Sequence, residues 1–124
     1  MANKKPIVVR RVLVIDDAQD VADITVEMLR SMGHVAEAVY DGKSGVSQAL
    51  RFQPDVVLVD LVMPEVDGFR LVRELRAMFP GKTPKLVAFT AHKQKSFLDA
   101  ADSAGFDAHI TKPVSEEMLA ALLV

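Results

Sequence analysis

Five polar residues stand where apolar runs of the sequence end, and their types fit one kind of chemistry. Three are acids, one is a hydroxyl residue and one is a lysine: Asp16, Asp17, Asp60, Thr90 and Lys112. Three carboxylates brought together repel one another, so they converge stably only when a cation joins them. Oxygen-only ligands select a hard cation, and Mg²⁺, which uses carboxylates, phosphate oxygens and waters, fits best. Because an ammonium and a hydroxyl suit phosphoryl oxygens, the set predicts a magnesium-dependent phosphoryl site.

The apolar runs themselves predict the strands that position these side chains. Strong runs occupy residues 11–15, 56–60 and 86–89, and weaker ones occupy residues 35–39 and 108–111. Their nearly continuous apolar character is typical of a parallel sheet covered on both faces, because a strand with one wet face would alternate apolar and polar residues. The sequence therefore predicts helices on both sides of the sheet.

Apolar residues at helical spacing lie between the runs and supply those helices. The first stripe contains Val21, Ile24, Met28, Leu29 and Met32, and the second contains Val46, Ala49 and Leu50. Further stripes fall within residues 71–78, 97–104 and 118–122, and the first four helices are expected to end near Gly33, Pro54, Pro80 and Gly105. Five alternations of strand and helix with right-handed crossovers predict an α/β fold, a doubly wound five-stranded parallel sheet. Its ligand crevice is expected at the carboxyl ends of the strands, where the five polar residues stand.

Length and composition narrow the class of protein. A chain of 124 residues predicts one domain, with residues 1–10 as a tail or extended lead-in and residues 11–124 as the folded unit. The net charge of -2 gives no electrostatic reason to expect direct binding of nucleic acid. The lack of cysteine excludes a disulfide framework and a thiolate metal site. The N-terminal apolar run is short and broken by Arg10 and Arg11, which favours a cytoplasmic protein without signal peptide or membrane span.

Each candidate residue also has an ordinary structural explanation. The acidic pair fits an N-cap of the first helix, and Asp60 fits a loop acid that binds nearby amides. Thr90 fits a β-branched strand end. Lys112 with Pro113 fits a turn in which the proline opens the last helix or forms a cis peptide bond. The functional interpretation rests on the whole set, because the five residues together stand at the ends of four of the five predicted strands.

The sequence resembles the receiver domain of two-component response regulators from about Arg11 to the C-terminus. Four motifs carry the resemblance: Val14-Ile15-Asp16-Asp17, the run from Leu58 to Pro64 with Asp67-Gly68 beyond it, Phe89-Thr90-Ala91, and Ile110-Thr111-Lys112-Pro113. The resemblance implies a flavodoxin-like fold with Asp60 as the phosphoacceptor and with Thr90 and Lys112 completing the site. It also implies that Mg²⁺ is bound by Asp16, Asp17, Asp60 and the backbone carbonyl of Val62.

One position departs from the family pattern. The family usually carries an aromatic residue shortly before the lysine, where this chain has His109. In the family's switch that ring turns inward as the hydroxyl residue, here Thr90, moves toward the phosphoryl group. Imidazole is smaller than phenol and can carry a charge, so the coupling is expected to be weaker, pH-sensitive or made by other residues. By the same resemblance, Val62 and His92 flank the site and modulate loss of the phosphoryl group.

The leading interpretation is a phosphoacceptor switch of a two-component phosphorelay. A histidine kinase or histidine phosphotransfer protein is expected to phosphorylate it in a Mg²⁺-dependent reaction, and a downstream output domain or protein to read the result. We expect no separate substrate, no contact with nucleic acid or membrane, and a monomer or weak phosphorylation-dependent dimer.

Two alternatives stay open. The first is an aspartate-nucleophile phosphatase or hydrolase of related fold, but such enzymes usually place one residue between two acids, whereas Asp16 and Asp17 are adjacent. The second is a phosphorylation-independent interaction module, which would be expected to lose Asp60, Thr90 or Lys112.

Overall fold

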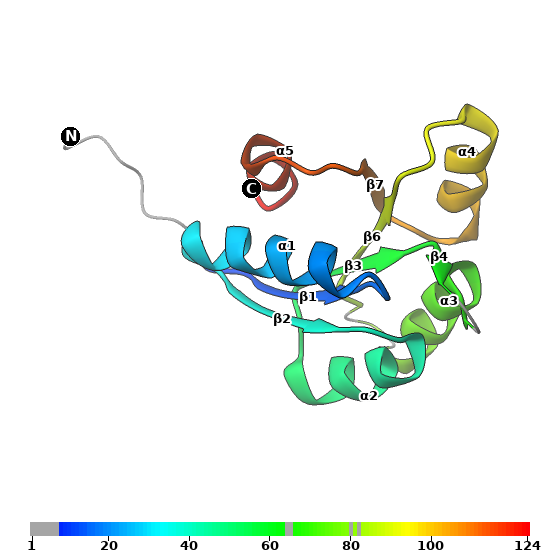
Figure 1. Cartoon of the computed structure of the whole chain (residues 1–124). Coiled ribbons are helices and arrows are strands. Elements are labelled where there is room, and N and C mark those ends of the chain that lie inside the picture. The colour runs from blue at the N-terminus through cyan, green and yellow to red at the C-terminus, as the bar shows by residue number, and fades with distance from the viewer. Residues whose placement is uncertain (1–7, 64–65, 80, 82) are drawn as a thin grey trace.

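The computed structural model describes residues 8–63, 66–79, 81 and 83–124, and its centre is a five-stranded parallel sheet (Figure 1). The strand order is β2-β1-β3-β6-β7, with bounds β1 (Arg11–Ile15), β2 (Val35–Val39), β3 (Val56–Asp60), β6 (Lys85–Thr90) and β7 (Ala108–Thr111). The two-residue strands β4 (Val62–Met63) and β5 (Val66–Asp67) pair antiparallel beyond the end of β3. The predicted doubly wound parallel sheet is confirmed.

Helices follow the strands and cover both faces of the sheet. They are α1 (Gln19–Ser31), α2 (Gly42–Phe52), α3 (Gly68–Met78), α4 (Lys95–Ala104) and α5 (Glu116–Leu122). Apolar residues of α1 and α5 pack on one face, and those of α2, α3 and α4 pack on the other. Among the described residues, every helix is too short or too polar to span a bilayer.

The central strand β3 shows why its sequence is apolar throughout. All five of its residues are buried. Val57 and Val59 enter the cluster beneath α2, α3 and α4, whereas Val56 and Leu58 enter the cluster beneath α1 and α5. Successive side chains point to opposite faces of a strand, so a sheet covered on both sides needs apolar residues at every position.

Two residues that the helical stripes predicted to face the core face solvent instead. Ile24 is 58% exposed and Leu50 is 49% exposed. The buried face of α1 consists of Ala22, Thr25, Val26 and Leu29. Leu29 belongs to the predicted stripe, and Val21, Met28 and Met32 of that stripe are partly buried against the same core cluster. Thr25 is tolerated there because its hydroxyl donates to the carbonyl of Val21 at 2.7 Å. Thr25 therefore faces the sheet where its neighbour Ile24 was expected.

Candidate functional site

The carboxyl ends of four neighbouring strands meet at one edge of the sheet and carry the predicted polar residues. Asp16 directly follows β1, and Asp60 and Thr90 are the last residues of β3 and β6. Lys112 directly follows β7, and its backbone N–H donates to the Thr90 carbonyl at 2.8 Å. Because the strands run parallel, this order brings side chains from four distant parts of the chain to the same edge.

Three carboxylates converge at this edge. Asp16, Asp17 and Asp60 each offer one oxygen, and these oxygens lie within 4.8 Å of one another. Asp16 is fully buried and Asp60 is 6% exposed, whereas Asp17 is open to solvent. An all-oxygen set of three acids with one side open fits a hard divalent cation that keeps water ligands. The donor set of this chain is therefore suited to Mg²⁺.

Lys112 provides the positive charge of the site. Its Nζ lies 2.6 Å from Oδ2 of Asp16 and 3.7 Å from Oδ2 of Asp60, and it also lies 4.7 Å from the centre of the Phe89 ring. The Lys112 side chain is only 17% exposed. Because a buried carboxylate is costly unless it is paired, this ammonium stabilises the acids without a metal ion. The ammonium is thus placed between two carboxylates of the cluster.

The pKa of Asp60 lies well above the ordinary value of an aspartate. Burial raises the pKa of Asp60 from its ordinary 3.8 to about 7, and the nearby charge of Asp16 adds to the rise. The Val62 N–H, which donates to Oδ1 of Asp60 at 3.2 Å, and the charge of Lys112 oppose the rise. A divalent cation bound by the cluster would favour the ionised form of Asp60. Loading a metal would therefore convert Asp60 into a carboxylate at neutral pH.

The structure does not support the capping explanation for the acidic pair. The N-cap residue of α1 is Ala18, and no side chain caps that helix end. Asp16 instead accepts a hydrogen bond from the backbone N–H of Ala18 at 3.0 Å, which orders the turn between β1 and α1. At the other end of the site, the Lys112-Pro113 peptide bond is cis, one of the two options that the sequence left open.

Thr90 is oriented by the loop that follows it. The residue is 1% exposed, and its hydroxyl oxygen accepts a hydrogen bond from the backbone N–H of His92 at 3.1 Å. The imidazole of His92 packs against the Phe97 ring of α4, with ring centres 4.6 Å apart. Val62, the other position expected to flank the acids, is 56% exposed.

His109 faces α4 and is not part of the acidic cluster. Its register partner on β6 is Ala88, and Thr111 pairs with Thr90, so His109 and Thr90 project from the same face of the sheet. The Nδ1 atom of His109 lies 3.7 Å from Oδ1 of Asp102, and the side chain is 36% exposed. In this structure the imidazole therefore occupies an outward position.

Gly68 positions the site, a role that the sequence signature did not assign to it. An added Cβ would lie 2.7 Å from the Cα of Leu61 and 2.8 Å from the carbonyl oxygen of Asp60. These are backbone atoms of the segment that carries the acceptor candidate, so they cannot move aside cheaply. The first turn of α3 can approach the end of β3 only because this position has no side chain.

We expect Gly68→Ala to lower the free energy of unfolding by about 1–3 kcal/mol and to weaken Mg²⁺ binding, because overpacking displaces the Asp60 backbone. Urea denaturation and a Mg²⁺ titration measure both effects. Gly45→Ala is the matched control, since the three nearest atoms to its added Cβ belong to the side chain of Ile15 and none belongs to the backbone. The control is expected to stay within about 1 kcal/mol of the parent protein. Equal stability of the two variants would contradict the packing argument.

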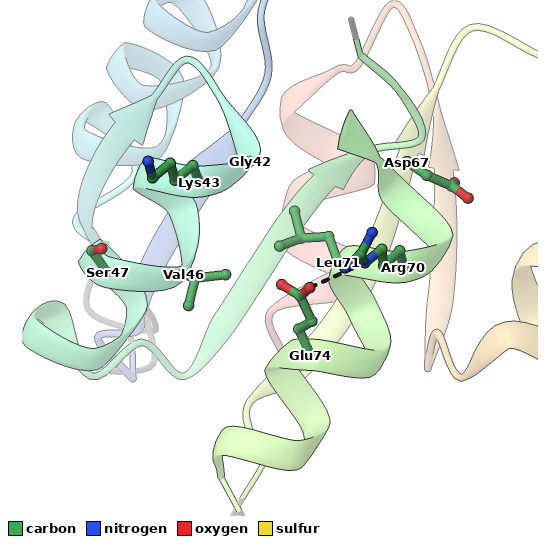
Figure 2. A pocket seen from close by; sticks show the side chains of 8 residues that line it. All are labelled: Gly42, Lys43, Val46, Ser47, Asp67, Arg70, Leu71 and Glu74. Atoms are coloured by element: carbon green, nitrogen blue, oxygen red, sulfur yellow. Dashed lines mark ion pairs between the residues drawn. The ribbon is translucent and has the colours of Figure 1, made fainter. Parts of the chain in front are cut away.

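A separate groove of about 550 Å³ lies between α2 and α3 (Figure 2). Val46 and Leu71 are its apolar lining residues, and charged residues of both signs stand around them: Lys43, Asp67, Arg70 and Glu74. Arg70 and Glu74 pair with each other at 3.4 Å. None of the five polar residues at the strand ends lines this groove.

The chain belongs to the response regulator receiver domain family, whose family model matches residues 12–124. It is 33% identical over 111 residues to the DNA-binding dual master transcriptional regulator RpaA of Synechocystis, covering 89% of this chain and 46% of RpaA. The chain thus spans about half the length of that relative. These findings define the protein as a receiver domain of response regulators, the class of phosphoacceptor switches in two-component signalling.

Solved structures agree with the family. The chemotaxis protein CheY4 of Vibrio cholerae superposes with a TM-score of 0.85 at 23% identity, covering 94% of this chain and 97% of that one, which shows the fold. The receiver domain of the sensor histidine kinase PA1611 of Pseudomonas aeruginosa superposes with a TM-score of 0.82 at 28% identity, covering 94% and 95%. That neighbour holds a magnesium ion coordinated in its active-site cleft.

Proposed function

We propose that this receiver accepts a phosphoryl group on Asp60 in a Mg²⁺-dependent reaction. The observation that carries the proposal is the convergence of Asp60 with two further acids and the Lys112 ammonium at one edge of the sheet. Asp16, Asp17, Asp60 and the backbone carbonyl of Val62 would hold the metal, and Thr90 and Lys112 would bind phosphoryl oxygens. The magnesium-bound PA1611 receiver supports the choice of metal.

The charges of the site suit the transfer of a phosphoryl group to Asp60. An oxygen of the Asp60 carboxylate attacks phosphorus in line, the bond from phosphorus to the donor nitrogen breaks, and the donor imidazole keeps the bonding electron pair and takes up a proton. The product is an acyl phosphate on Asp60. Bound Mg²⁺ would neutralise charge on the transferring oxygens. Lys112 supplies a second positive charge beside those oxygens, and the Thr90 hydroxyl supplies a hydrogen-bond donor.

The partners follow from the same chemistry. The donor would be a histidine kinase or a histidine phosphotransfer protein, and an output domain or protein would read the phosphorylated surface. The domain would assist its own phosphorylation and dephosphorylation without a separate substrate, in the cytoplasm, as a monomer or a weak phosphorylation-dependent dimer.

The adjacency of Asp16 and Asp17 argues against a phosphatase or hydrolase, and the filled acceptor, hydroxyl and lysine positions argue against a phosphorylation-independent module.

The metal requirement is tested by incubating the protein with acetyl phosphate, with and without Mg²⁺, and measuring intact mass. We expect a phosphorylated species only when Mg²⁺ is present. The Asp16→Asn/Asp17→Asn double variant is expected to lose Mg²⁺ affinity by at least about 100-fold, because it keeps one of three acids. Its apo form should be less stable than the parent, because the largely buried Lys112 ammonium loses its partner Asp16 at 2.6 Å and keeps only the weaker contact with Asp60 at 3.7 Å. Phosphorylation in the presence of a chelator would contradict the proposal.

The life of the acyl phosphate is expected to depend on Val62. The exposed isopropyl group next to Asp60 can shield the phosphorus from water but cannot orient a water for attack. Val62→Asn supplies a carbonyl and an amide at the same position, so its phosphorylated form should lose phosphate several-fold faster. The decay is followed by intact mass after removal of acetyl phosphate, with Val62→Leu as an apolar control of slow decay. Equal lifetimes in Val62→Asn and the parent would remove the shielding argument.

A further inference from the structure

The Lys112 ammonium lies on the face of an aromatic ring as well as between two acids. Its Nζ is 4.7 Å from the centre of the Phe89 ring, within the distance at which a cation is attracted to the negative face of a ring. Its carboxylate neighbours are Asp16 at 2.6 Å and Asp60 at 3.7 Å. Within the described part of the chain, the ammonium therefore has partners of two kinds, anionic oxygens and an aromatic face.

The Phe89 ring is fixed by the core, whereas the Lys112 side chain is fixed at its base. Phe89 is fully buried on β6, where its register partners are Asp60 of β3 and Ile110 of β7. The backbone N–H of Lys112 donates to the Thr90 carbonyl, but the four-carbon side chain beyond it has many rotamers. The ring is thus a fixed surface against which a flexible cationic side chain lies.

A divalent cation would affect the two kinds of partner unequally. Asp16 and Asp60 are two of the three acids suited to Mg²⁺, so a bound cation would compete with the ammonium for their oxygens. Phe89 offers no ligand atom to a metal, so its attraction for the ammonium would persist. In the metal-loaded protein, Lys112 would therefore depend on the ring to stay at the strand ends.

The space beside Lys112 gives its side chain room to move away. A pocket of about 380 Å³ is lined by Lys112 and Phe89 together with apolar residues of α1 and of the segment after β7: Val21, Ile24, Met28, Pro113 and Val114. Thr25 also lines it, but its hydroxyl already donates to the Val21 carbonyl. Among the described residues, no carboxylate lines this pocket. A side chain that left the ring would thus find space there without a charged partner.

We propose that Phe89 is a positioning residue of the phosphoacceptor site, an inference that rests on the proposed function. Its ring holds the Lys112 ammonium beside Asp60 when Mg²⁺ occupies the acids, so that the positive charge is in place for phosphoryl oxygens. Phe89 acts only through Lys112. Its loss should therefore weaken binding of a phosphoryl group to the metal-loaded protein much more than it weakens binding of the metal.

The experiment compares the parent with two changes at position 89. Phe89→Met keeps flexible apolar volume and removes the ring. Replacement of Phe89 by pentafluorophenylalanine keeps the shape of the ring and removes the negative charge of its face, on which the attraction depends. Phe52→Met is the matched control, because Phe52 is also buried and lies 4.2 Å beneath a cation, Arg11, but at the amino-terminal edge of the sheet.

Two dissociation constants are measured for each protein from the shift of the Val62 amide. The first is for Mg²⁺ alone, and the second is for beryllofluoride, a mimic of the phosphoryl group, at saturating Mg²⁺. We expect both changes at position 89 to weaken beryllofluoride binding at least about threefold and to alter Mg²⁺ binding less than about twofold. Phe52→Met should match the parent in both constants.

The fluorinated protein separates attraction from packing. Parent-like beryllofluoride binding in the fluorinated protein would overturn the inference, because a ring of the same shape would then suffice without its charge. Equal weakening of Mg²⁺ and beryllofluoride binding in Phe89→Met would also overturn it, since that result indicates a general distortion of the site. Both outcomes leave the proposed function standing. Absence of a beryllofluoride response in the Mg²⁺-loaded parent would overturn the proposed function itself.

Discussion

An Asp60→Asn variant is expected to give no detectable phosphorylation with acetyl phosphate and Mg²⁺. The amide that replaces the carboxylate lacks a nucleophilic oxygen anion, and no other acid of the cluster has the same position between Val62 and Lys112. Intact mass, followed by peptide mapping, measures the effect. Asp99→Asn is a suitable control because that carboxylate is exposed on α4 and pairs with Lys95. Equal modification of Asp60→Asn and the parent would exclude Asp60 as the acceptor.

The same variant is expected to change how stability depends on pH. The pKa of Asp60 is about 7 in the folded protein and 3.8 ordinarily, so the folded state binds this proton more tightly than the unfolded state. Its contribution to stability is therefore fully present below pH 3.8 and is lost as pH rises through about 7. Since one pKa unit corresponds to about 1.4 kcal/mol, and since Asp16 and Lys112 share the effect, we expect a net loss of about 1–3 kcal/mol.

Urea denaturation in a chelating buffer between pH 5 and pH 8 measures this loss. Asp60→Asn should show a flatter profile than the parent and should be the more stable protein at pH 8. Mg²⁺ should reduce the difference at pH 8, because it binds the ionised form of the parent. Parallel profiles for the two proteins would show that Asp60 does not titrate in this range.

The convergence of the site residues was predictable because it depends on topology. Parallel strands end at the same edge, so an acid after β1, an acid ending β3 and a lysine after β7 must meet there once the alternation of strands and helices is recognised. The sequence patterns for β1 and β3 are strong because all but one of their positions are buried, whereas the pattern for β7 is weaker because His109 is exposed. No turn or helix signal in the sequence contradicted these strand patterns.

The packing details were not predictable for an equally physical reason. The inward face of α1 contains Thr25, which is buried because its hydroxyl finds a carbonyl within its own helix. Hydrophobicity alone ranks Ile24 above it, although Ile24 faces solvent. The close approach of Gly68 to Asp60 and the contacts between His92, Phe97 and Phe69 likewise depend on tertiary distances. Residue type and spacing contain no information about such distances.

Replacement of Lys112 by methionine is expected to give the largest loss of stability in metal-free protein. Methionine keeps much of the aliphatic length and removes the charge, so Asp16 is left fully buried without its partner at 2.6 Å. Removing one member of a buried ion pair typically costs about 3–5 kcal/mol. Protonation of Asp60 and entry of water relieve part of this cost. We therefore expect the free energy of unfolding of Lys112→Met to fall by about 2–4 kcal/mol at pH 8 and by less at pH 5.

Mg²⁺ should distinguish this explanation from simple loss of packing. A divalent cation bound to the three acids replaces the positive charge of Lys112, so saturating Mg²⁺ should restore most of the stability of Lys112→Met in urea denaturation. The matched control is Lys95→Met, which removes an exposed pairing with Asp99 and should stay within about 0.5 kcal/mol of the parent with or without metal. If Lys112→Met were equally destabilised at all Mg²⁺ concentrations, the loss would come from packing against Phe89, and the electrostatic role of Lys112 in the site would be wrong.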